Sequence, residues 1–368
     1  MASLFSSRGV VSFVLLLGWW GFHLMGYNCC YGEGMVPAMY VFGDSLADVG
    51  NNNHLETLLK ADFPHNGIDY PGHKATGRFS NGKNSADFLA EKLGVPSSPP
   101  YLSIPSNSNK TDVFMNGVSF ASGGAGILDS TNSGQCLTLN KQIDYYSTVY
   151  GTLVQQLGSA QAQEHLSKSI FAVIIGSNDM LNYVKSSSSK NLKSTPQQFV
   201  DSLISSLQGQ LKRIYNLGAR KFAFIGTGPI GCCPSLRHQN KTGDCNVEAN
   251  YLSVLYNKGA TSMLQELKSQ LGDMSYSFFD TSSALLLYIQ KPASYGFAEV
   301  KAACCGLGDL NAKIACIPIS TYCSNRKDHI FWDFYHPTET TAGMLVNTAF
   351  DGAQPFVYPM NIRQLSAL

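Results

Sequence analysis

The sequence predicts an α/β protein: a three-layer α/β/α sandwich built on a sheet of about five parallel strands. Short apolar runs alternate along the chain with longer segments in which apolar residues recur at helical spacing. Several of the short runs end in turns of glycine and polar residues. Parallel neighbours need long crossover connections, usually helices, so this alternation favours a parallel sheet with helices on both faces.

The first half of the chain contains three predicted strands. The run 38–42 is apolar and stops at a glycine, and a possible short helix follows at 54–60. Helical spacing of apolar residues predicts a helix at 84–93, which also stops at a glycine. Further strands are predicted at 113–120 and 170–175, and each runs into a glycine-containing turn.

The second half continues the same alternation. Helical periodicity predicts long helices at 197–217 and 247–271. Apolar runs predict strands at 221–225 and 275–279, and a further helix is predicted at 282–289.

Composition indicates a globular chain. Of the 368 residues, 44% are hydrophobic and 14% are charged, which supports a large core and argues against a disordered protein. We expect one domain at 33–368, with an exposed loop in the serine patch 186–189. The formal charge is +1 and no dense run of Lys and Arg occurs, so nucleic acid is not an expected partner.

The first 32 residues predict a signal peptide. Arg8 precedes an apolar stretch at about 10–27, and small or polar residues follow it. A membrane anchor is the alternative, but a span needs about 20 apolar residues, and this stretch is interrupted by glycines and a histidine. We expect residues 1–32 to be removed and the mature protein to be secreted, with no stable membrane span.

The cysteines suit an oxidising compartment. Of the ten cysteines, Cys29 and Cys30 lie in the expected signal peptide. The eight that remain are an even number, which favours disulfides, and we expect these to cluster in the second half of the chain. Many pairings are possible, so none is predicted, but we expect a disulfide-held loop at 302–326. No C-x-x-C pair is present to hold zinc, and no metal or cofactor is expected. Sequons at Asn109 and Asn240 predict glycosylation.

Three turns at predicted strand ends carry the groups of a candidate active site. Open parallel sheets bind ligands beyond the carboxyl ends of their strands, and such turns lie at 43–45, 122–124 and 176–179. Ser45 offers a hydroxyl nucleophile and a backbone N–H on a tight turn. The glycine turn offers another N–H and Asn178 an amide donor, so that these groups together can form an oxyanion hole.

A carboxylate and an imidazole near the C-terminus complete the groups of this candidate active site. Asp333 stands three residues before His336, a spacing that lets the carboxylate hold one ring nitrogen while the other faces Ser45. A helix is predicted to begin at 337 or 338 and to run through 346. His329 is the alternative base, but the apolar residues that follow it are typical of a core strand.

The segment 41–53, Val-Phe-Gly-Asp-Ser-Leu-Ala-Asp-Val-Gly-Asn-Asn-Asn, closely resembles the first sequence block of plant GDSL esterases/lipases, a branch of the SGNH hydrolases. The segments 116–127, 173–180, 228–234 and 331–337 resemble the later blocks. The resemblance covers nearly all of the chain after the expected signal peptide. It implies the flavodoxin-like SGNH hydrolase fold, with strand order 2-1-3-4-5.

The resemblance also implies the roles of the catalytic residues. Ser45 is then the nucleophile, His336 the base and Asp333 the carboxylate behind it. The chain is expected to be a secreted serine esterase or lipase that acts on lipid or acylated cell-wall esters. Two alternatives stay open, an acyltransferase that uses the same serine and a non-catalytic extracellular protein that kept the fold. Acyl and alcohol specificity and the oligomeric state do not follow from the sequence.

By the same resemblance, the oxyanion donors are Ser45, Asn178 and a glycine of the second block. Counting along that block favours Gly124 over Gly123. The usual asparagine of the block is replaced by Ser119, which puts one supporting hydrogen bond in doubt.

Two other motifs bear on this interpretation. The segment 77–84 nearly matches a phosphate-binding loop, but Asn84 stands where Ser or Thr must hold magnesium, and no strand precedes the segment. No G-x-S-x-G elbow is present, which argues against the common α/β-hydrolase arrangement.

Overall fold

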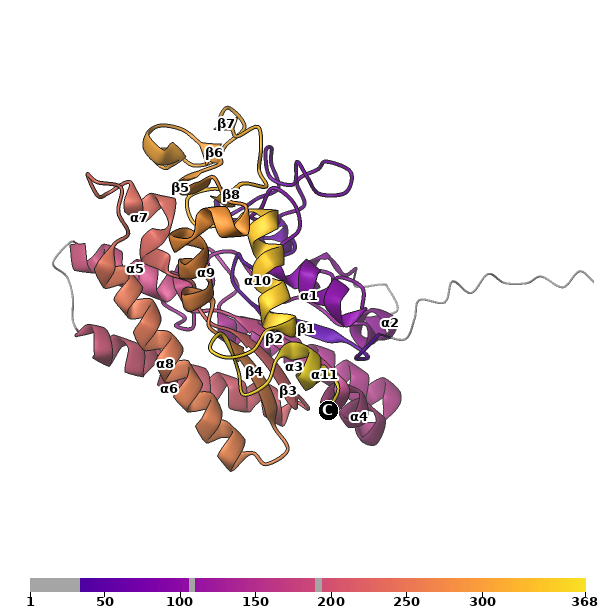
Figure 1. Ribbon diagram of the computed structural model, residues 1–368. Helices are drawn as coiled ribbons and strands as arrows, with labels where there is room; N and C mark the ends of the chain where they lie inside the picture. The colour runs from indigo at the N-terminus through magenta and orange to yellow at the C-terminus, as the bar shows by residue number, and fades with distance from the viewer. Residues whose placement is uncertain (1–33, 106–109, 189–193) are drawn as a thin grey trace, which may run out of the picture. The chain divides into compact units, whose positions relative to one another are not determined.

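A mainly parallel sheet forms the centre of the structure (Figure 1). The structure, a computed structural model, describes residues 34–105, 110–188 and 194–368. The sheet order is β1-β2-β3-β4-β9, in which the first four strands are parallel and β9 is antiparallel to β4. The strands are β1 (Met39–Gly43), β2 (Ile170–Ile174), β3 (Lys221–Ile225), β4 (Ser275–Phe279) and β9 (Val357–Tyr358). The strands predicted at 38–42, 170–175, 221–225 and 275–279 are confirmed.

Helices cover both faces of this sheet, which confirms the three-layer sandwich (Figure 1). Large aromatic side chains such as Phe171 and Phe224 point to one face, and smaller ones such as Ala172 point to the other. The first face packs against α3 (Leu139–Leu157), α4 (Ser159–Lys168), α5 (Ser177–Ser188), α6 (Pro196–Asn216) and α8 (Val247–Gln270). The second face packs against α1 (Ser85–Leu93), α9 (Thr281–Gln290), α10 (Glu339–Asp351) and α11 (Ile362–Ser366).

Short elements connect these layers. They are α2 (Lys110–Met115), α7 (Pro234–Arg237), and the 3₁₀ turns η1 (Asn51–His54), η2 (Tyr101–Ser103), η3 (Ile230–Cys232), η4 (Pro292–Tyr295) and η5 (Asp309–Asn311). None of the described helices combines the length and apolarity needed to cross a membrane.

The strand predicted at 113–120 is only partly correct. Its first residues belong to α2, and its last residues run beside β1 on the side away from β2. There, the Val41 N–H donates to the Val118 carbonyl (3.0 Å) and the Phe120 N–H donates to the Val41 carbonyl (2.8 Å). Gly117 permits this approach, because its φ is 95° and a Cβ would lie 2.1 Å from the Met39 carbonyl oxygen. With this extended segment as the second strand, the parallel part of the sheet follows the expected 2-1-3-4-5 order.

Three other expectations about local structure were wrong or incomplete. The helix predicted at 54–60 is absent, and the Leu59 N–H instead donates to Thr57 Oγ1 (3.0 Å). A local side-chain bond of this kind competes with helix formation. The serine patch 186–189 belongs to α5 as far as Ser188. The two consecutive helices α3 and α4 had not been predicted.

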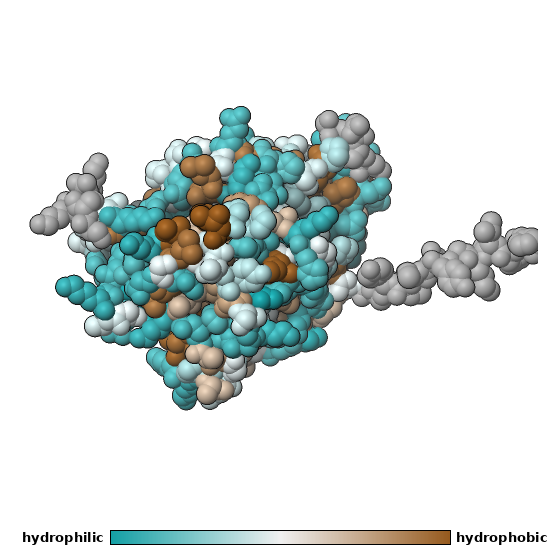
Figure 2. Space-filling view, turned by 90° about the horizontal axis from the view of Figure 1, so that it is seen from above, coloured by the Kyte–Doolittle hydropathy of each residue, from teal (hydrophilic) through white to brown (hydrophobic). Residues whose placement is uncertain are grey.

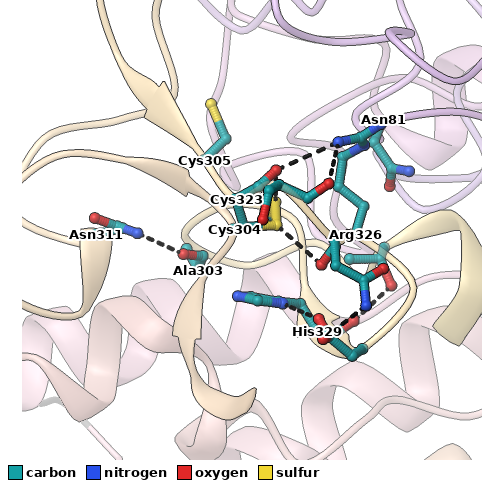
Figure 3. The surroundings of a disulfide bond; sticks show 12 residues. Asn81, Ala303, Cys304, Cys305, Asn311, Cys323, Arg326 and His329 are labelled. Carbon is teal, nitrogen blue, oxygen red and sulfur yellow. Dashed lines mark hydrogen bonds and ion pairs between the residues drawn. A yellow bond between two sulfur atoms is a disulfide. The ribbon is translucent and has the colours of Figure 1, made fainter. Parts of the chain in front are cut away.

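The Cys-rich segment near the C-terminus forms two small sheets. One pairs β5 (Glu299–Ala303) with β8 (His329–Phe331), and the other pairs β6 (Cys305–Gly306) with β7 (Thr321–Tyr322). Asn311 Nδ2 donates to the Ala303 carbonyl (2.8 Å) and ties the loop to β5 (Figure 3).

The predicted clustering of disulfides in the second half is confirmed. The pairs are Cys232–Cys245, Cys304–Cys323 and Cys305–Cys316. Cys136 and Cys233 are free thiols, so the even count of eight does not mean that all eight are paired. The expected disulfide-held loop at 302–326 contains two of these three bonds.

A buried ion pair fixes the segment that precedes α1. Arg78 donates to both carboxylate oxygens of Asp87, through Nε (2.6 Å) and Nη2 (2.7 Å). The two side chains are only 8% and 5% exposed. Burial disfavours the charged carboxylate, but the Arg78 guanidinium outweighs burial and holds the pKa of Asp87 below its ordinary value. Asp87 also completes the capping box of α1 with Asn84.

We predict that Arg78→Met lowers the free energy of unfolding by about 3–5 kcal/mol, because it leaves the Asp87 charge buried and unpaired. The measurement is urea unfolding under oxidising conditions. Lys168→Met, which removes the exposed pair with Glu164, is the control and should leave stability nearly unchanged. Equal losses in the two variants would contradict this account.

Candidate active site

The structure brings residues from distant parts of the chain to the carboxyl ends of the strands. Ser45 follows β1, and Asn178 lies in the first turn of α5, which follows β2. Asp333 and His336 lie between β8 and the N-terminus of α10. Figure 1 shows β8 and the start of α10 close together.

Ser45, His336 and Asp333 form one chain of hydrogen bonds. Ser45 Oγ lies 2.7 Å from His336 Nε2. On the other side of the ring, His336 Nδ1 lies 2.7 Å and 2.8 Å from the two oxygens of Asp333. Asp333 also accepts the backbone N–H of His336 (2.9 Å), so the carboxylate fixes both the ring and the turn that carries it.

The negative charge of Asp333 favours the protonated form of the His336 imidazole. Burial disfavours the charged imidazolium, but the negative charge of Asp333 and the hydrogen bond to it outweigh burial and raise the pKa of His336 above its ordinary value. The pKa of Asp333 is lowered, because the attraction and hydrogen bonds of His336 outweigh the effect of burial on the carboxylate. The ring of Phe79 lies 5.0 Å from that of His336, centroid to centroid, and packs against one side of the imidazole.

The backbone distinguishes between the two glycines. The Gly123 N–H donates to Asp48 Oδ2 (2.9 Å), whereas the Gly124 N–H has no partner among the described residues. The Ser45 N–H likewise has no hydrogen-bond partner among the described residues. Gly124 has a φ of 86°, and a Cβ there would lie 2.4 Å from a methyl group of Leu59. Gly124 is therefore the glycine of this turn whose N–H is available to a ligand.

Asn178 is oriented by a single backbone contact. Its Nδ2 donates one hydrogen to the Ala125 carbonyl (3.0 Å). An amide nitrogen carries two hydrogens, so the second is left for a ligand. Both Asn178 and Gly124 line the same cavity as Ser45 and His336.

Two buried carboxylates, Asp48 and Asp179, hold the backbone near Gly123 and Ile127 in place. Sequence reasoning missed both carboxylates. Asp48 accepts the Gly50 and Gly123 N–H groups (2.8 and 2.9 Å), and burial raises its pKa to about 6. Asp179 accepts the Ile127 N–H (2.8 Å). Asp48 stands in the segment 41–53, but nothing in its spacing shows that it reaches a turn 75 residues away.

Asp44 is a third residue that sequence reasoning missed. Its side chain is buried, and Oδ2 has no hydrogen-bond partner among the described residues. Burial raises the pKa of Asp44 to about 7, although the Leu46 N–H and the nearby His336 oppose that effect. A second titratable group, besides His336, thus lies next to Ser45.

Ser119 takes no part in the contact expected of the usual asparagine. Its hydroxyl is buried and lacks a hydrogen-bond partner among the described residues. The segment is held instead by Asn51, whose Nδ2 donates to the carbonyls of Ser119 and Ala121, both at 2.9 Å.

The remaining candidates lie apart from this site. His329 is paired with Asp328 (2.7 Å) beside the Cys304–Cys323 disulfide (Figure 3). Asn84 caps α1. Asn240 is exposed, whereas Asn109 and the predicted signal peptide 1–32 lie outside the described residues.

A cavity of about 230 Å³ opens at Ser45 and His336. Most of its lining is apolar, in contrast to the surface in Figure 2, where hydrophilic side chains cover most of the face and hydrophobic ones form small groups. Ligand sites commonly combine an apolar lining with a few convergent polar groups. This arrangement can bind a carbonyl compound and present it to a hydroxyl nucleophile.

Comparisons with known proteins agree on one family. The family model for GDSL-like lipase/acylhydrolase matches residues 39–347. A GDSL esterase/lipase of Arabidopsis thaliana is 45% identical over 339 residues, which cover 90% of each chain. A second one is 40% identical over 315 residues, which cover 84% of this chain and 87% of the relative.

Among solved structures, the chain is similar to a catalytic mutant of an acetylxylan esterase from Geobacillus stearothermophilus, with a TM-score of 0.37, 12% identity, and coverage of 84% of this chain and 90% of that chain. The family model and the relatives cover most of the sequence, and the expected resemblance is confirmed. The chain therefore belongs to the GDSL-like lipase/acylhydrolase family of carboxylic ester hydrolases.

Proposed function

We propose that this protein is a secreted serine esterase that cleaves carboxylic esters through a covalent acyl-enzyme on Ser45. The observation that carries the proposal is the hydrogen-bonded chain from Ser45 Oγ through His336 to Asp333, with contacts of 2.7 Å on each side of the ring. Nucleophile, base and orienting carboxylate in this order are the parts that acyl transfer by a serine requires.

In the proposed reaction, Ser45 Oγ attacks the ester carbonyl carbon while His336 Nε2 takes the hydroxyl proton. The N–H groups of Ser45 and Gly124 and the free amide hydrogen of Asn178 donate to the developing oxyanion. The imidazolium then gives its proton to the departing alcohol oxygen. A water molecule attacks the acyl carbon in the second half of the reaction, with His336 again as the base, and releases the acid and the free serine.

Several features support secretion. The three disulfides among the described residues suit an oxidising compartment, and the sequon at Asn240 is exposed. We extend the proposal to cleavage of residues 1–32 as a signal peptide, a single domain at 33–368, and glycosylation at Asn109 and Asn240. Lipid esters and acylated cell-wall esters are the proposed substrate classes.

Two alternatives differ from hydrolysis in measurable ways. An acyltransferase would pass the acyl group from Ser45 to an alcohol, so products formed with a competing alcohol separate it from a hydrolase. A non-catalytic protein with this fold would not react with an active-site-directed fluorophosphonate. The hydrogen bond between Ser45 and His336 favours a reactive serine over that second alternative.

Asn178→Ala tests the oxyanion donors. Loss of one donor typically lowers turnover on the order of a hundred- to a thousand-fold, and we expect that loss here, with a folded protein. The measurement is kcat for a p-nitrophenyl ester together with the unfolding free energy. Asn347→Ala, at an exposed amide on α10, is the control. Turnover close to wild type in Asn178→Ala would remove Asn178 from the mechanism.

The pH profile tests His336 as the base. A base must be neutral, so kcat/KM should fall as the pH drops through the pKa of His336. Because that pKa is raised, we expect the midpoint to lie above about 6.5, the usual imidazole value. Asp333→Asn should move the midpoint to lower pH and reduce kcat by on the order of a thousand- to ten-thousand-fold.

Asp44 must be separated from His336 in this profile, because its pKa of about 7 lies in the same range. In Asp44→Asn the acidic fall in rate should persist, with its midpoint moved to lower pH, since the Asp44 charge contributes to the raised pKa of His336. A rate that stays flat from about pH 5 to 8 in wild type would count against His336.

A further inference from the structure

The cavity at Ser45 continues along the sheet as an apolar arm, lined there by Ile174, Ile225 and Phe279. Its floor is one row of residues in register across the strand ends, because Ile174 pairs with Ile225, and Ile225 pairs with Phe279. The row begins at Gly43 of β1, the partner of Ile174. Adjacent strands lie about 4.8 Å apart, so a floor that crosses from β1 to β4 is about 14 Å long.

Helices of the second face form the roof of this arm. Leu345 and Val346 both lie on the face of α10 that carries Ala349, since positions three and four residues apart are neighbours on a helix. Leu285 of α9 and Ile362 of α11 also line the arm. All five side chains are buried. The arm is therefore lined mainly by buried apolar side chains.

The other side of the cavity has a different character. Asn132, Asn182 and Lys185 line it, and Lys185 is exposed. Asn182 and Lys185 lie with Asn178 on one face of α5, at spacings of four and three residues. The reacting groups therefore lie between a side lined by polar residues and an apolar arm.

We propose that the apolar arm binds the acyl group of the substrate, and that the enzyme prefers unbranched aliphatic acyl chains of about eight to twelve carbons. This inference rests on the proposed acyl-enzyme mechanism. The acyl group stays on Ser45 while the alcohol leaves and water enters. The polar side, where Lys185 is exposed, suits that exchange, and the apolar arm, whose side chains are buried, suits the group that remains.

The dimensions set the chain length. An extended chain advances about 1.2 Å per single bond, since a residue of three bonds spans about 3.3–3.6 Å. A length of about 14 Å then takes about twelve bonds. Each buried methylene contributes enough free energy for about a three- to fourfold gain. kcat/KM should therefore rise with chain length until the arm is full and then level off.

The test is kcat/KM for monodisperse p-nitrophenyl acetate, butyrate, octanoate and dodecanoate. For wild type we expect octanoate to exceed acetate by at least about a hundredfold, since the six extra methylenes are buried. Ala349→Phe fills the arm and should lower the ratio of dodecanoate to butyrate by at least tenfold. Asn347→Phe, two residues earlier on the exposed face of α10, is the matched control and should keep the wild-type ratio.

Folding is checked by thermal unfolding of each variant. If Ala349→Phe does not fold, Ala349→Leu makes the same test with a smaller side chain. Hydrolysis that depends on Ser45 but shows no preference for octanoate over acetate, or an unchanged ratio in the folded Ala349 variant, would overturn the acyl arm and leave the esterase proposal intact. Loss of the proposed function itself would appear differently, as no Ser45-dependent hydrolysis of any of the four esters.

Discussion

The hydrogen bond between Ser45 and His336 is the constraint on which the site depends, because it joins residues 291 positions apart in the chain. The serine is fixed by β1, at the centre of the fold. The imidazole is fixed by the turn between β8 and α10, where Asp333 accepts both a ring N–H and a backbone N–H. Because α10, which follows His336, packs on the second face of the sheet, the packing of that face helps to place His336 beside Ser45.

Buried polar side chains hold the backbone segments around Ser45 in place. Asp48 holds the turn that contains Gly123, and Asp179 holds the segment that follows it. Gln142 of α3 bonds to both the N–H and the carbonyl of Gly43, each at 2.9 Å, directly before the nucleophile turn. An unpaired buried polar group is costly, whereas a fully bonded one rigidifies its surroundings. These contacts explain how flexible glycine turns can present N–H groups in fixed directions.

Much of the fold could be predicted from the sequence. Four short runs marked the parallel strands, three of them followed by a glycine, and the polar turns after them marked the edge where the site lies. The disulfide partners could not be predicted, because pairing is a property of the folded loop around β5 to β8. The strand predicted at 113–120 began too early, because residues 110–115 form α2, and Gly117, with a φ of 95°, separates that helix from the extended segment beside β1.

Local patterns also explain which parts of the site could be found. Ser45, Asn178, Asp333 and His336 stand at strand ends or at a spacing that suggests chemistry. Asp44 and Asp48 lack such a signal, since their importance lies in burial and in backbone groups that they reach through space. The choice of Gly124 over Gly123 likewise depends on which N–H Asp48 already occupies.

The central claim is that Ser45 carries the acyl group during turnover. The most direct measurement is mass spectrometry of enzyme quenched during turnover of a slowly deacylating ester, followed by peptide mapping. The account predicts a mass increase equal to one acyl group, located on the peptide that contains Ser45 and absent from Ser45→Ala. An unmodified Ser45 in enzyme that is turning over substrate, or an acyl group on another residue, would contradict it.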